Sequence, residues 1–167
     1  MNLGEQQRML GVLTIEVVDA SGAIVETRRV PNLITTAGKK LMADILMGKR
    51  PAPSAWAIAV GTGKPKTPEQ TQAVATAPQA SNTALEGQVA EANATCIVDV
   101  ENEVVSATVK GSLTALLPSE SEQALVEAGI LMKVGTETNR TLFNRVTFSQ
   151  VTRGQMMHLN LSWKISF

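Results

Sequence analysis

The chain has 167 residues, enough for one domain with a sizeable core and too few for two ordinary cores. Hydrophobic residues make up 44% of the chain and aromatic residues 3%, so we expect an aliphatic core. The 15 Lys and Arg residues balance 15 Asp and Glu residues. This balance excludes a whole-molecule field that would hold nucleic acid or a membrane surface, and we expect neither as a partner.

We expect residues 1–11 to form an N-terminal arm and residues 12–167 to form a single β domain. Within that domain we expect a hairpin, residues 12–30, followed by a core, residues 31–167. Leu13, Ile15 and Val17 alternate with polar residues, which is typical of a half-buried strand. A turn sequence, Asp19-Ala20-Ser21-Gly22, leads into a second strand that we expect to end at Pro31, because proline interrupts a strand ladder.

A short helix is expected over about residues 36–47. Thr35 or Thr36 can cap its first amide groups, and Leu41, Ile45 and Leu46 fall on one stripe. Gly48 then serves as a C-terminal stop.

After a short apolar strand, residues 56–60, comes a long segment rich in Pro, Thr, Gln and Ala, residues 61–81. Its prolines argue against a helix or a central strand. Loops of this length are usually binding loops or segments that order on a partner. We therefore expect an arm that binds a neighbouring subunit, with Val74 and Leu85 as apolar anchors.

The rest of the chain is a run of expected strands separated by turns: 95–100, 104–109, 111–117, 125–134, 141–148 and 157–167. The last is the clearest, since Leu159, Leu161, Trp163 and Ile165 alternate strictly with polar residues. The expected fold class is mainly β, a β-sandwich or jelly-roll-like barrel with one short helix and the long loop 61–81.

Residue types that carry catalysis are sparse. His158 is the single histidine, so neither a triad nor a His-rich metal site can be assembled, and we expect it exposed on the last strand. Cys96 is the single cysteine, and it lies in an apolar run typical of a small core residue. Gly61 and Gly63 precede a lysine but lack the rest of a phosphate-binding loop, which favours a turn after a strand. We expect no cofactor, no metal and no enzymatic activity.

Two charged residues interrupt strands that are otherwise apolar, Glu127 and Arg145. One interpretation is that both lie on the solvated face. The other, which we favour, is a buried Glu–Arg pair that sets the register of the two strands, and loss of either partner would then cost several kcal/mol.

Six short motifs occur in a characteristic order over most of the chain: 32–38, 58–63, 82–86, 127–131, 142–148 and 161–165. They run from Asn-Leu-Ile-Thr-Thr-Ala-Gly through a Gly-Thr-Gly turn and Glu-Ala-Gly-Ile-Leu to Leu-Ser-Trp-Lys-Ile. This order resembles a group of small phage virion proteins encoded near capsid or tail-fibre genes, and more loosely the collar domain of tail fibres. The hairpin of residues 13–30 lies outside the resemblance.

The resemblance implies a virion structural protein, made in the host cytoplasm and assembled as a symmetric homo-oligomer, with a trimer favoured. Its other partners would be tail, baseplate or major capsid proteins. The first hypothesis is an adaptor for fibres at the tail or baseplate, and the alternative is a decoration protein that stabilises the head. A glycan-binding or glycan-cleaving virion protein is the third hypothesis, which the low aromatic content disfavours.

Overall fold

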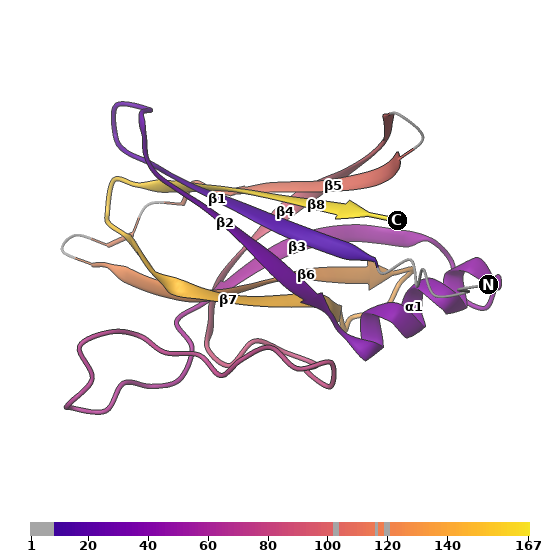
Figure 1. Cartoon of the computed structure of the whole chain (residues 1–167), viewed down its shortest axis with the longest axis horizontal. Coiled ribbons are helices and arrows are strands. Elements are labelled where there is room, and N and C mark those ends of the chain that lie inside the picture. The colour runs from indigo at the N-terminus through magenta and orange to yellow at the C-terminus, as the bar shows by residue number, and fades with distance from the viewer. Residues whose placement is uncertain (1–8, 102–103, 116, 119–120) are drawn as a thin grey trace, which may run out of the picture.

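A computed structural model describes residues 9–101, 104–115, 117–118 and 121–167. These residues form eight strands and one helix: β1 (Leu10–Val18), β2 (Ile24–Ile34), α1 (Thr36–Leu46), β3 (Pro53–Gly61), β4 (Gln88–Glu101), β5 (Val104–Leu113), β6 (Gln123–Val134), β7 (Thr141–Arg153) and β8 (His158–Ser166) (Figure 1). The predicted mainly β class and the predicted short helix are confirmed.

The strands close into an antiparallel barrel with the order β1-β2-β7-β6-β3-β4-β5-β8. Closure depends on the N-terminal hairpin, because β1 pairs with β8 from Leu10 opposite Ser166 to Val18 opposite His158. The hairpin is therefore an integral part of the barrel. Of the expected N-terminal arm, residues 10 and 11 already belong to β1, and residues 1–8 lie outside the described residues.

The barrel interior is filled by aliphatic side chains, as the composition predicts. The alternation in β8 places Leu159, Leu161, Trp163 and Ile165 inside, and Trp163 is fully buried. Burial of this kind contributes about 25 cal/mol per Å² of apolar surface removed from water. Trp163 thus stabilises the core and has no exposed surface with which to contact a partner.

Helix α1 begins where the capping pattern predicts. The Thr35 hydroxyl accepts the amide of Gly38 at 2.9 Å and donates to the carbonyl oxygen of Leu142 at 2.6 Å. Gly38 lies so close to β7 that an added Cβ would be 2.4 Å from the carbonyl oxygen of Phe143. With Leu41 buried in the core, the helix is fixed against the first residues of β7.

Several predicted strand boundaries are wrong, since β4 begins at Gln88 instead of residue 95 and β7 continues to Arg153 instead of ending at residue 148. Strand β2 does not end at Pro31, which lies within it opposite Val12. A proline is tolerated there because this stretch of β2 has a free edge, at which a missing N–H breaks no ladder bond. The predicted strands 104–109 and 111–117 are replaced by one strand, β5, which ends at Leu113 and in which Gly111 lies within the ladder between Ala94 and Leu161.

The long loop between β3 and β4 is folded onto its own barrel. It carries a backbone bridge between Lys64 and Val74, and the amide of Ala73 donates to the Gln150 side chain of β7 at 2.9 Å. Leu85 is buried against Ala59 and Leu142 on the outer surface of the barrel. The loop is therefore held on its own chain, and Leu85 is not a free anchor, whereas binding of a neighbouring subunit through the exposed Val74 stays a prediction.

Candidate functional site

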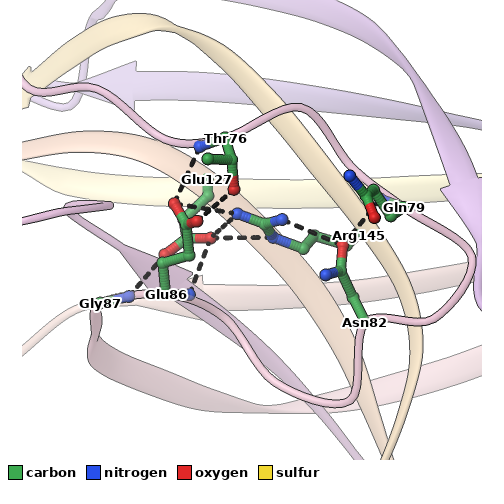
Figure 2. A network of polar contacts seen from close by, with 7 residues as sticks. All are labelled: Thr76, Gln79, Asn82, Glu86, Gly87, Glu127 and Arg145. Carbon is green, nitrogen blue, oxygen red and sulfur yellow. Dashed lines mark hydrogen bonds and ion pairs between the residues drawn. The ribbon is translucent and has the colours of Figure 1, made fainter.

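Glu127 and Arg145 form the buried ion pair that the sequence predicts. They come from adjacent strands, β6 and β7, and Arg145 lies opposite Gly129, two residues from Glu127. The guanidinium donates from Nε at 3.0 Å and from Nη2 at 2.8 Å to Oε2 of Glu127 (Figure 2). Both side chains are fully buried, and a charge-assisted contact with two donors is among the stronger polar interactions.

The same pair holds the long loop. Glu127 accepts the backbone amides of Gly87 at 2.8 Å and Glu86 at 3.2 Å. Arg145 donates from Nη1 to the Asn82 side chain at 3.0 Å, and its Nη2 lies 3.5 Å from Oε2 of Glu86. We call this network the clasp, and it comprises Thr76, Asn82, Glu86, Gly87, Glu127 and Arg145 (Figure 2).

Three glycines let the loop come this close to the barrel. An added Cβ would lie 2.5 Å from Oε1 of Glu127 at Gly61 and 2.2 Å from the carbonyl oxygen of Gly63 at Gly87. Gly63 also has a φ of +70°, in the left-handed region that favours glycine. The glycines of the Gly-Thr-Gly turn therefore serve close backbone approach.

Glu86 closes the outer side of the clasp. Its carboxylate accepts the amide of Thr76 at 2.8 Å and the hydroxyl of the same residue. Burial raises the pKa of Glu86, but the hydrogen bonds from Thr76 and the positive charges of Arg145 and Lys64 outweigh it. The net effect is a pKa below the ordinary 4.5, so the folded loop favours the ionised carboxylate.

The clasp should loosen in acid. Because the folded pKa of Glu86 is lowered, its contribution to loop stability is present above about pH 4.5 and is lost as the pH falls through the folded value. We expect the hydrogen-exchange protection of the Thr76 amide to be constant above about pH 4.5 and to decrease as the pH falls from there through the folded pKa. The Lys64 amide, which donates to the carbonyl of Val74 in the same loop, is the internal control and should stay protected. Glu86→Gln should remove the pH dependence at Thr76, and an unchanged dependence in that variant would contradict the assignment.

The polar groups of the clasp have a structural role. Both oxygens of Glu127 already accept hydrogen bonds, and the side chain has no exposed surface. Arg145 likewise donates hydrogen bonds from Nε, Nη1 and Nη2 to residues of its own chain. Neither residue is placed to bind a substrate, so the pair positions the loop on the barrel.

The remaining predicted residues are dispersed. Val74 is exposed on the loop, and Trp163 is in the core. The expectation of an exposed His158 is wrong, since this residue is half-buried and its Nδ1 atom lacks a hydrogen-bond partner among the described residues. Cys96 packs partly against the core, and burial raises the pKa of its thiol. Within the described residues, no group of three or more His, Cys, Asp or Glu side chains could hold a metal ion.

Sequence reasoning missed a buried arginine at the other end of β7. Arg153 donates to the carbonyl oxygen of Met157 and to the Gln123 side chain, each at 3.2 Å, and also to the carbonyl oxygen of Ala115. Burial lowers the pKa of Arg153. The arginine ties the ends of β6 and β7 to the segment after β5, a role that no local pattern indicates.

A second feature that the sequence did not reveal lies where β4 and β5 extend beyond the barrel. Here Val98, Val100, Val105 and Phe167 are exposed, between 40% and 66% each. Val98 is opposite Ala107 and Val100 is opposite Val105, while the amide of Phe167 donates to the carbonyl of Val105. These four residues, the end patch, continue the core-facing side of the sheet past the point where the core covers it.

A shallow polar depression of about 420 Å³ lies over the outer face of β1, β8 and β5. Its lining includes Glu16, Lys110, Ser112 and Asn160, and Ser112 and Asn160 are joined by a side-chain hydrogen bond of 2.9 Å. Such a surface has small and polar side chains in place of the aromatic platforms on which sugars stack.

No protein-family model matches the chain, and neither a curated protein nor a solved structure matches it. In the part of the chain that the structure describes, no helix has both the length and the apolar character needed to cross a membrane.

Proposed function

We propose that this protein is a non-enzymatic structural subunit of a phage-type particle, an adaptor at the tail or baseplate that assembles with copies of itself and with other virion proteins. The order of the six sequence motifs supports the class of protein. The end patch is the observation that carries the proposal, because it supplies an apolar surface that a partner subunit would cover.

The end patch has the features of an interface core. Val98 and Val100 are 66% and 64% exposed, and they share one face with Val105 and Phe167. Clustered exposed apolar side chains of this kind mark interaction sites more often than scattered ones do. Interface cores are apolar and poor in charge, which fits this group of residues.

The clasp supports the same proposal in a different way. A particle subunit needs a rigid β core, and the buried pair holds against that core a loop that composition alone would leave free. The virion location, the trimer and the choice of tail over head rest on the resemblance. The polar depression offers no aromatic platform, so it does not favour the glycan-binding alternative.

The test is incorporation into particles produced in cells that encode the protein. Val100→Asp should abolish incorporation, because a carboxylate placed in the apolar contact would have to be buried without a partner. Ile97→Asp is the matched control, since Ile97 is 57% exposed in the same strand but faces the opposite side. Gold labelling at one vertex would indicate the tail, and labelling over the whole shell would indicate decoration. Absence of the wild-type protein from purified particles would overturn the proposal.

A further inference from the structure

Strand β2 has a free edge over most of its length. It pairs with β1 from Ile24 to Asn32. Among the described residues, its pairing with β7 is limited to Leu33 and Ile34. Figure 1 shows β2 and β7 meeting at one end and diverging toward the other. The edge from Ile24 to Pro31 thus offers unpaired peptide groups to another strand.

The position of Pro31 indicates which peptide groups point outward. Pro31 lies opposite Val12 and has no N–H, so this pair is one of the non-hydrogen-bonded pairs of the β1–β2 ladder. Alternation along an antiparallel ladder then directs the peptide groups of Thr27 and Arg29 away from β1. The same alternation explains why Leu33 reaches β7.

We propose that this edge binds the β2 strand of a second copy of the chain, antiparallel and about a two-fold axis through Thr27. In that register Thr27 lies opposite its own counterpart. Glu26 of each copy lies opposite Arg28 of the other, so two ion pairs form across the contact. Opposite charges directly across a strand pair are favourable, and like charges are not.

The charge pattern selects this register over its neighbours. If one β2 strand shifts by one residue relative to the other, peptide groups that point away from β1 in one copy face peptide groups that point toward β1 in the other. The hydrogen bonds between the two strands are then lost. The next allowed shifts set Glu26 against Glu26 or Arg28 against Arg28. The edge is therefore self-complementary in one register, as an isologous two-fold contact requires.

The charged side chains are free to exchange partners. In the single chain, Nε of Arg28 lies 2.6 Å from Oε1 of Glu26 on the same strand. Both residues share a face with the core-lining Ile15 and Val17, yet the Arg28 side chain is 44% exposed because β7 has diverged. On the same face Ile24 is 54% exposed, and in the dimer it lies opposite Val30 of the other copy.

This inference rests on the proposed function, which includes assembly of the chain with copies of itself. It adds which strand forms the contact between the copies. A two-fold contact makes assemblies from dimers, in place of the trimer that the resemblance implies. It uses β2 and leaves the end patch free for a different partner.

The test is a charge-swap experiment on the full chain by light scattering, with circular dichroism to verify folding. The wild type should have twice the chain mass of 17.7 kDa. Glu26→Arg and Arg28→Glu should each weaken dimerisation by about tenfold or more, because each makes both cross-strand pairs repulsive.

Mixing the two variants should restore a dimer. One chain then carries two positive charges at positions 26 and 28, and they face two negative charges at the same positions of the other chain. Lys39→Glu, an exposed charge reversal on α1, is the matched control and should dimerise as the wild type does.

Three outcomes would overturn the contact: a monomeric wild type, an oligomer that persists in both variants, or two monomeric variants that fail to associate when mixed. A persistent oligomer would leave self-association intact and place its interface elsewhere. The proposed function is tested separately by incorporation into particles, so its failure is distinguishable from failure of the β2 contact.

Discussion

Arg145→Met should lower the free energy of unfolding by about 3–5 kcal/mol, because the change leaves the fully buried Glu127 carboxylate without its cation. Methionine fills a similar volume without the charge, so the loss reports the broken pair more than a cavity. Urea denaturation monitored by circular dichroism measures the change. Protection of the Gly87 amide, which donates to Glu127, should also decrease.

Two further variants make this prediction specific. Arg140→Met removes an exposed arginine that pairs with Glu91 and should cost less than about 1 kcal/mol. Adding Glu127→Gln to Arg145→Met should recover part of the loss, because the second change removes the unpaired buried charge. If the loss of unfolding free energy in the double variant equals the sum of the losses in the two single variants, the two residues are not energetically coupled.

Gly63→Ala should lower the free energy of unfolding by about 2–5 kcal/mol. Its φ of +70° costs an alanine about 1–2 kcal/mol. The new Cβ would also lie 2.3 Å from the carbonyl oxygen of Val74, and such overpacking costs about 1–3 kcal/mol. The same denaturation experiment measures the sum.

Gly22→Ala separates the two contributions. Gly22 has a φ of +85° in the turn between β1 and β2, and nothing lies within 4 Å of an added Cβ. It therefore reports the backbone cost alone. Equal effects of the two substitutions would contradict the close packing of the loop on the barrel.

The clasp changes how the long loop is understood. Its composition, rich in Pro, Thr, Gln and Ala, is that of a segment without regular structure, and the described residues carry one isolated bridge between Lys64 and Val74. Order comes from Glu127 and Arg145, which lie 40 to 63 residues away in sequence from the loop residues they contact. A buried ion pair without further hydrogen-bond partners would be costly. This pair is stabilised because loop amides and Asn82 complete its hydrogen bonds.

Local pattern was a reliable guide wherever one residue's environment depends on its immediate neighbours. Alternation in β8 predicted which side chains are buried, and Thr35 predicted the start of α1. The Glu127–Arg145 pair was predictable because each charge interrupts an apolar strand, and a buried charge needs a partner. The predicted end of β2 at Pro31 was wrong, because whether a proline interrupts a strand depends on whether that edge of the strand is paired, and local sequence does not contain this information.

By itself, then, the sequence determined the mainly β class, the position of the helix, the aliphatic core and the existence of a buried ion pair, because all follow from short-range periodicity and from the cost of unpaired charge. The tertiary structure alone decided that the N-terminal hairpin closes the barrel, that the long loop is held on its own chain, and that the edge of β2 and the end patch are left uncovered. These depend on which strands meet across long separations, and the energy of such pairings lies in contacts that no local window of sequence contains.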